Sequence, residues 1–141
     1  MRLLVTGGRE YSHRTVVHGV LDLLHAERPI VTLIHGGCGN VEPYKGADGH
    51  AHTWAVERDV AIEIYLADWQ KYGLAAGTQR NGVMLRDGRP NLVLAFPGRG
   101  GTADCVAQAL ALKIPVTTVY RGLVLDTAWA RAVRDTTKKG G

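Results

Sequence analysis

Three glycine clusters constrain the fold of this chain more than any other feature of its sequence. Each cluster follows a short apolar run. Glycines at 7–8 follow the run at 3–5, those within 36–39 follow the run at 30–34, and those within 98–101 follow the run at 92–96. A helical pattern begins after each cluster. This succession of strand, glycine turn and helix predicts an α/β fold with a parallel sheet. Because the carboxyl ends of parallel strands lie on one edge of a sheet, we expect the three clusters to gather there.

Apolar periodicity places the other elements around these turns. Strands are predicted over residues 2–6, 30–35, 60–65, 91–96 and 116–120, and helices over 13–28, 47–59, 75–87 and between Gly101 and Pro115. The period-two alternation of residues 60–65 indicates an edge strand with one wet face. We therefore predict a Rossmann-like, three-layer α/β fold with a mainly parallel five-stranded sheet. A single domain is expected over residues 1–141, with a core over about 2–120 and a C-terminal helix or tail over 121–141, a helix there beginning at Asp126.

The composition excludes several classes of protein. The 141 residues carry 17 Lys and Arg against 13 Asp and Glu, a formal charge of +4, and 45% hydrophobic residues, which is typical of a globular domain. No apolar run approaches the roughly 20 residues of a membrane span. Glycines and charged residues occur within the first ten positions, where a signal peptide would have an apolar segment. We therefore expect a cytoplasmic protein. The cysteines lack CxxC spacing and His50 and His52 point to different faces of a helix, so no metal or cofactor is expected. A basic helix with interleaved aromatic residues is absent, so nucleic acid is not expected as a partner.

Residues 97–102 combine two features of a phosphate site. Glycines let backbone amides approach an anion closely, and Thr102 opens a helix whose N-terminus offers unpaired N–H groups. The alternative is a tight turn that binds nothing, but three such turns on one edge favour a phosphate-bearing ligand. The sequence has no GxxxxGK[ST] motif, and its first turn is not GxGxxG. A P-loop NTPase and a dinucleotide oxidoreductase are therefore not indicated.

Short motifs follow one another in the order found in a known protein group. They are Val5-Thr6-Gly7-Gly8-Arg9, His35-Gly36-Gly37 followed by Lys45-Gly46-Ala47-Asp48, Ala67-Asp68-Trp69, Arg80-Asn81 with Met84, and Phe96-Pro97-Gly98-Arg99-Gly100-Gly101-Thr102-Ala103-Asp104. As an ordered set over residues 2–120, they resemble the YspA-type branch of the SLOG superfamily, which also holds the Lonely Guy enzymes and DNA-processing protein A. The resemblance implies a Rossmann-like fold, a pocket for a nucleotide-derived ligand and a homo-oligomer. Small proteins of this kind occur in bacterial and phage genomes, which points to sequestration of a defence signal.

The expected ligand contacts come from the glycine turns and from polar side chains beside them. The phosphate is expected at the turn before Thr102, and Arg9 and Arg80 are expected to neutralise it. Arg80 matches an arginine that lines the ligand site in Lonely Guy enzymes. The full set of predicted ligand-binding residues is Gly7, Gly8, Arg9, Gly36, Gly37, Tyr44, Asp48, Arg80, Asn81, Pro97, Gly98, Arg99, Gly100, Gly101 and Thr102.

Two members of this set have alternative roles. Residues 38–44 lengthen the second turn relative to the branch pattern. Tyr44 in this insertion can stack on a base, or it can pack on its own loop. Asp48 can bind a ribose hydroxyl, or it can cap the helix that follows the turn. The sequence leaves the two roles of Tyr44 open and favours the cap for Asp48.

The catalytic signature of the Lonely Guy enzymes is only partly present. Their PGGxGTxxE motif uses its glutamate to cleave the N-glycosidic bond of a nucleoside monophosphate. Here Cys105 occupies the glutamate position, and Asp104 lies one residue earlier, which on a helix is a rotation of about 100°. Binding is therefore favoured over hydrolysis, and Asp104 is the catalytic candidate if the protein is an enzyme.

Three functional hypotheses follow. The first is a protein that binds, senses or sequesters a nucleotide-derived signal, such as an ADP-ribose-like or cyclic-nucleotide species. The second is a nucleoside-monophosphate N-glycosidase. The third, by analogy with DNA-processing relatives, is single-stranded DNA binding, which predicts a steep salt dependence that a buried small-ligand site need not show.

Overall fold

The computed structural model describes residues 1–120 and 123–124 of the chain. The elements, in chain order, are β1 (Arg2–Thr6), α1 (Arg14–Glu27), β2 (Thr32–His35), α2 (Gly46–Glu57), β3 (Ala61–Ile64), α3 (Trp69–Tyr72), the 3-10 turn η1 (Gly73–Ala75), α4 (Ala76–Gly88), β4 (Leu92–Ala95), α5 (Gly100–Ala111), β5 (Val116–Tyr120) and β6 (Leu123–Val124). All five predicted strands are present. The helix expected to begin at Asp126 lies outside the described residues.

The strands form one sheet in the order β3-β2-β1-β4-β5-β6. β1 to β5 run parallel, which confirms the predicted Rossmann-like architecture, and β6 adds a two-residue antiparallel pairing to β5. β3 is an edge strand, as its period-two alternation predicted. The chain winds outward from β1 in both directions, because β2 lies on one side of it and β4 on the other. Open α/β sheets bind ligands at such a reversal of strand order, outside the carboxyl ends of the strands.

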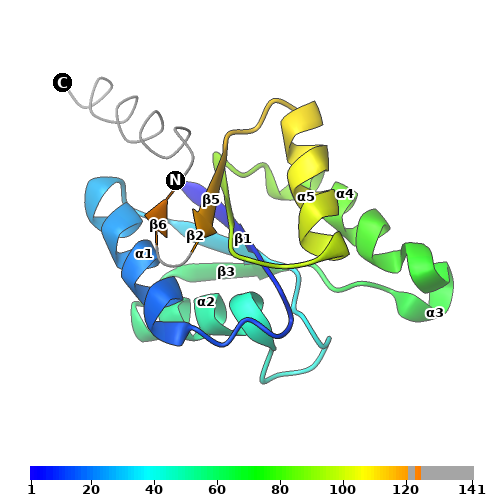
Figure 1. Cartoon of the computed structure of the whole chain (residues 1–141), viewed down its shortest axis with the longest axis horizontal. Helices are drawn as coiled ribbons and strands as arrows, with labels where there is room; N and C mark the ends of the chain where they lie inside the picture. Colours follow the sequence, from blue (N-terminus) through cyan, green and yellow to red (C-terminus); the bar gives the residue numbers. More distant parts are fainter. Residues whose placement is uncertain (121–122, 125–141) are drawn as a thin grey trace.

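Helices cover both faces of the sheet, which gives the three layers (Figure 1). α1 and α2 pack on one face, where Leu3 and Val5 lie in one core with a fully buried Trp54. α4 and α5 pack on the other face, where Leu4 lies in a second core with Met84. The opposite destinations of Leu3 and Leu4 follow from the alternation of side chains along a strand. Among the described residues, no helix is long and apolar enough to cross a membrane.

Candidate functional site

Backbone packing holds the turns after β1 and β4 and the start of α2 together. The Gly8 N–H donates to the Pro97 carbonyl at 2.8 Å, and the Ala47 N–H donates to the Gly8 carbonyl at 3.3 Å. Glycine is required at these contacts: a Cβ on Gly7 would lie 2.5 Å from the Cβ of Ala47. Gly46 has a φ of +62°, and a Cβ there would overlap the Gly8 carbonyl oxygen. These glycines therefore build the floor of the site by letting three backbones approach one another.

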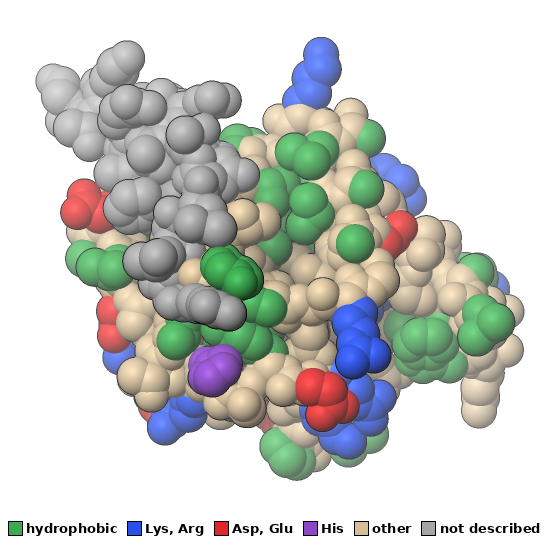
Figure 2. All heavy atoms as spheres, in the orientation of Figure 1, with side chains coloured by type: hydrophobic (Ala, Val, Ile, Leu, Met, Phe, Trp, Pro, Cys, Tyr) green, Lys and Arg blue, Asp and Glu red, His purple; other side chains and the backbone are tan. Residues whose placement is uncertain are grey.

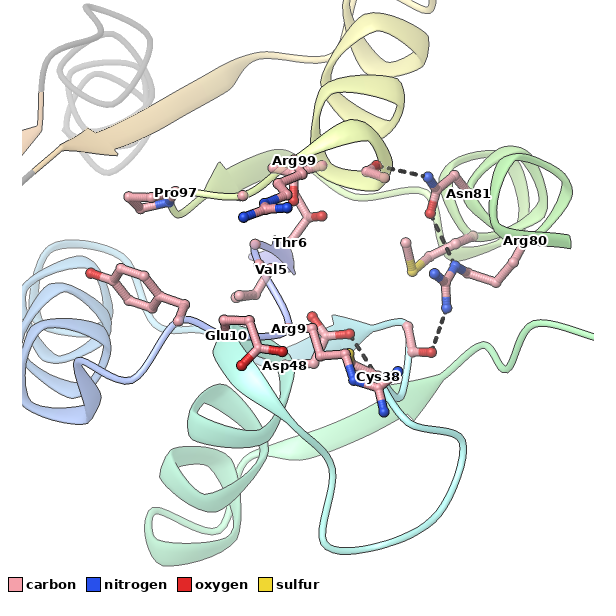
Figure 3. Close-up of a pocket in the computed structure, with 18 residues that line it drawn as sticks. Val5, Thr6, Arg9, Glu10, Cys38, Asp48, Arg80, Asn81, Pro97 and Arg99 are labelled. Atoms are coloured by element: carbon pink, nitrogen blue, oxygen red, sulfur yellow. Dashed lines mark hydrogen bonds between the residues drawn. The ribbon is translucent and has the colours of Figure 1, made fainter. Parts of the chain in front are cut away.

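A cleft of about 780 Å³ opens above this floor, at the carboxyl edge of the sheet (Figure 3). Its volume lies in the range of small-molecule sites. The predicted residues that line it are Gly7, Gly8, Arg9, Gly36, Asp48, Arg80, Asn81, Pro97, Gly98, Arg99, Gly101 and Thr102. Residues that the sequence analysis did not assign to the site also line it: Val5, Thr6, Glu10, Tyr11, Cys38 and Met84. Several of these stand directly beside predicted residues, and Met84 lies one helical turn after Arg80.

Three arginines give the cleft its positive charge. Arg9, Arg80 and Arg99 all line it, and within the described part of the chain none of them forms an ion pair. The N-terminus of α5 adds unpaired backbone N–H groups at the same edge. A Cβ at Gly101 would meet nothing within 4 Å, so this turn leaves space for a ligand. The arrangement suits an anionic group bound beside the start of α5.

Hydrogen bonds hold Arg80 in the wall of the cleft. Its Nη1 donates to the Gly36 carbonyl at 2.5 Å, and its Nε donates to Oδ1 of Asn81 at 3.0 Å (Figure 3). Gly36 is needed for this contact, because a Cβ there would lie 2.5 Å from the Arg80 guanidinium. The amide of Asn81 is in turn held by α5: its Nδ2 donates to Oδ2 of Asp104 at 3.0 Å. The first turn of α5 therefore fixes the orientation of the arginine on α4.

Asp104 does not line the cleft. It borders a separate shallow hollow between α4 and α5, where its Oδ2 accepts hydrogen bonds from Asn81 and, at 2.8 Å, from Nε2 of Gln108. The side chain that the sequence analysis named as catalytic candidate is thus engaged in joining two helices. The one-residue offset from the Lonely Guy glutamate accounts for this position, since it turns the side chain around the helix axis.

Asp48 places a carboxyl group in the cleft (Figure 3). Its side chain is buried, and its Oδ2 accepts a hydrogen bond from the Cys38 N–H at 3.2 Å. The expectation that Asp48 caps α2 is wrong, because Lys45 is the N-cap residue and makes no side-chain cap bond. Burial raises the pKa of Asp48 to about 6, while Arg80 and the backbone N–H groups of Cys38 and Gly36 favour the charged form.

The ionisation of Asp48 makes the folded state less stable as the pH rises. The carboxyl titrates near 3.8 when unperturbed and near 6 when folded, so between these values the folded protein binds more protons than the unfolded chain. We expect Asp48→Asn to raise the free energy of unfolding at pH 7.5 by up to about 3 kcal/mol, and to leave it near the wild-type value at pH 4. Urea unfolding of both proteins at the two pH values measures this. Equal stabilities at pH 7.5 would contradict it.

Tyr44, Gly37 and Gly100 do not line the cleft. The Tyr44 ring packs edge-on against His35 and His52, with centroid distances of 5.3 and 5.1 Å. The Gly37 N–H donates to Nδ1 of His35, which assigns the ring proton to Nε2, and Nε2 then donates to Nδ1 of His52 at 3.0 Å. Burial lowers the pKa of His35 to about 3. The inserted loop is thus attached to the end of β2 beside the cleft, and Tyr44 serves that attachment.

The comparisons with known proteins identify the family. The sequence model of the YspA, cpYpsA-related SLOG family matches residues 1–72 of this chain. The chain belongs to this family. A relative, Gene 61 protein of Mycobacterium phage D29, is 38% identical over 123 residues, which cover 82% of this chain and 93% of that protein. Membership in the SLOG family supports a nucleotide-related role for the cleft, and the likeness to a phage protein extends over nearly the whole of that relative.

Proposed function

We propose that this SLOG protein binds a nucleotide-derived small ligand and holds it without cleaving it. The observation that carries the proposal is the set of cleft arginines, Arg9, Arg80 and Arg99, none of which forms an ion pair with a carboxylate among the described residues. An ionised ligand group would supply the missing partner, and charge-assisted hydrogen bonds from guanidinium groups are among the strong polar contacts. The turn over residues 97–102 and the start of α5 would hold the phosphate.

The biological role that fits this proposal is sensing or sequestration of a nucleotide signal. A cleft of about 780 Å³ accommodates a ligand as large as an ADP-ribose-like or cyclic-nucleotide species. A relative occurs in a phage, and in a phage a protein of this kind would sequester a defence signal during infection. A binder that acts in this way needs stoichiometric capture and slow release rather than turnover.

The experiment that tests the proposal is identification of captured ligand by mass. The full-length protein is incubated with a panel of nucleoside monophosphates, ADP-ribose and cyclic nucleotides, desalted and denatured, and the released compounds are analysed by mass spectrometry. One intact compound per chain is the expected result. No retained compound from the whole panel would contradict the proposal. A steep loss of binding with salt to an added single-stranded oligonucleotide would instead support the DNA-binding hypothesis.

A nucleoside-monophosphate N-glycosidase is the second candidate, and Asp48 is the observation that favours it. Asp48 is a carboxyl group inside the cleft with a pKa of about 6, so near that pH it could protonate the departing base. Water would then add its hydroxyl to C1′ of the ribose, and its remaining proton would return to Asp48. Free base and ribose 5-phosphate in the filtrate of the same experiment would identify this activity.

The glycine turn before α5 offers a matched pair of variants. Gly100 and Gly101 are neighbours, and a Cβ at either meets nothing within 4 Å, but only Gly101 lines the cleft. We expect Gly101→Ala to weaken binding of the captured nucleotide about tenfold, because the new methyl group enters the ligand space, and Gly100→Ala to leave binding within twofold. Both variants should unfold within a few degrees of the wild type. Equal affinities of the two variants in titration calorimetry would argue against a ligand at this turn.

A further inference from the structure

A chain of polar contacts leads from the inserted loop, residues 38–44, to the wall of the cleft. At the loop, Oε1 of Glu42 lies 2.9 Å from Nε2 of His52 on α2. Nδ1 of His52 lies 3.0 Å from Nε2 of His35 at the end of β2, and Nδ1 of His35 accepts a hydrogen bond from the Gly37 N–H at 3.0 Å. The loop, α2 and the turn after β2 are therefore connected through two imidazole rings.

The last member of this chain is one peptide group, the one that joins Gly36 to Gly37. Its N–H donates to His35, and its carbonyl accepts from Nη1 of Arg80 at 2.5 Å (Figure 3). The peptide group is planar, so its two ends move together. Donation by its N–H also polarises its carbonyl and makes the carbonyl a stronger acceptor. The bond to His35 therefore supports the bond that holds Arg80 in the cleft wall.

The direction of these bonds assigns the proton of each ring. Because Nδ1 of His35 accepts from Gly37, the His35 proton is on Nε2, which donates it to Nδ1 of His52. A neutral His52 then carries its own proton on Nε2, which faces the Glu42 carboxylate. Each Nδ1 is thus an acceptor in an existing bond. A further proton on either Nδ1 breaks one of these bonds.

The surroundings favour a positive charge on His52 rather than on His35. Burial, then the neighbouring His52 and Arg80, lower the pKa of His35 to about 3. His52 has the Glu42 carboxylate beside it, which attracts a positive charge. The other elements around the rings and the Gly37 turn contribute Tyr44 of the inserted loop, Ile64 of β3, Leu66 after it, and, from α1, His18, which lies 3.8 Å from Glu57.

We propose that His52 is an acid-sensitive switch that loosens Arg80 from the wall of the cleft. When the pair of rings takes up a proton, the His35 proton moves from Nε2 along the existing bond to Nδ1 of His52, and the proton from water is placed on Nδ1 of His35. His52 becomes an imidazolium beside Glu42, and His35 stays neutral in its other tautomer. Nδ1 of His35 then no longer accepts from Gly37, so the peptide group loses one of its two bonds.

The strengths of the bonds explain why the switch acts on Gly37. In the acid form, the bond between the rings joins a charged donor on His52 to a neutral acceptor on His35, and such bonds are about twice as strong as neutral ones. If His35 instead kept its bond to Gly37, two ring N–H groups would face each other where His35 is fully buried. The neutral bond to Gly37 is therefore the one that breaks.

The test follows the ring protons and the cleft wall in one titration. Full-length protein labelled with ¹⁵N is titrated from pH 8 to pH 5 without ligand, and NMR reports the protonation of each histidine nitrogen, the Gly37 amide and the Nε–H of Arg80. We expect His52 to gain a proton on Nδ1 and His35 to exchange its Nε2 proton for one on Nδ1. The Gly37 and Arg80 signals should shift with the same midpoint, because one proton drives all of these changes.

Two variants and a control test the two ends of the chain. His52→Gln has no group that titrates, so the Gly37 and Arg80 signals should become independent of pH. Glu42→Gln removes the carboxylate that favours the imidazolium, so the shared midpoint should fall by about half a pH unit or more. Acidic side chains are scattered over the face of the molecule in Figure 2, so the loss of a charge as such needs a control. Glu27→Gln on α1 supplies it and should leave the midpoint unchanged.

The outcomes decide the proposal without a ligand, and so independently of the proposed function. The switch is refuted if wild-type His52 takes up no proton by pH 5, or takes one up while Nδ1 of His35 stays unprotonated. It is also refuted if the Gly37 and Arg80 signals do not move, or if they still respond to pH in His52→Gln. The side chain of Glu42 is 66% exposed, so Glu42→Gln tests the chain of contacts even if His52→Gln does not fold.

Discussion

Replacing Arg80 with alanine is expected to weaken binding of the captured nucleotide about 10- to 100-fold. The guanidinium is fixed in the cleft wall by its bonds to Gly36 and Asn81 and keeps Nη2 for a ligand, so its loss removes charge-assisted hydrogen bonds that no neighbour replaces. Arg80→Lys should retain part of the affinity, because the charge remains but the planar fork does not. We expect the affinity for the nucleotide to fall in the order wild type, Arg80→Lys, Arg80→Ala. Titration calorimetry of the three proteins at one salt concentration measures it.

The matched control for this prediction is Arg86→Ala. Arg86 lies on the same helix, α4, but does not line the cleft. Its replacement changes the net charge by the same amount, so it measures the effect of long-range electrostatics alone. If Arg86→Ala weakens binding as much as Arg80→Ala, the cleft wall is not where the ligand is held.

The second large effect is expected on stability, from Gly46→Ala. Gly46 has a φ of +62°, and the added Cβ would overlap the Gly8 carbonyl oxygen, so the change strains the backbone and separates the first two turns of the floor. We expect the free energy of unfolding to fall by about 3–5 kcal/mol. Urea unfolding followed by circular dichroism measures this loss.

Gly19→Ala is the control that measures the effect of replacing a glycine by alanine where the added Cβ causes no overlap. Gly19 lies in the middle of α1, and a Cβ there meets nothing within 4 Å. Alanine has the higher helix propensity, so we expect this variant to gain about 0.5–1 kcal/mol. Gly46→Ala with wild-type stability would show that the turns after β1 and β2 are not held together as the structure has them.

Local patterns were sufficient to predict the architecture and most of the cleft. The strand Leu92–Ala95, for example, is a continuous apolar run, and a glycine turn follows it. Parallel strands that helices cover on both faces have such continuous apolar sequences. Because all carboxyl ends of such strands meet at one edge, the turns at Gly7 and Gly98 could be assigned to one site without any knowledge of their contacts. Arg80 came from the family resemblance, since a single arginine on a helix gives no such signal by itself.

The orientation of individual side chains at the site could not be predicted in this way. Tyr44 stands in an inserted loop, and its packing depends on His52, almost two helical turns into α2, and on His35 at the end of β2. The roles of the glycines were also only partly visible. Those at positions 7 and 46 allow close contact between backbones, whereas Gly101 leaves open space. The residue type is glycine in each case, so the sequence alone does not distinguish these roles.

By itself, the sequence determined the parallel sheet, the edge at which its glycine turns gather and the positive charge of that edge, because these depend on the order and periodicity of residues along the chain. Only the tertiary structure decided which carboxyl group belongs to the cleft. Asp104 follows the glycine turn over residues 97–102 in sequence but is directed to Asn81 and Gln108, while Asp48, more than fifty residues earlier, is buried in the cleft wall. The physical reason is that side-chain direction on a helix depends on how that helix packs against its neighbours, which distance along the chain does not reveal.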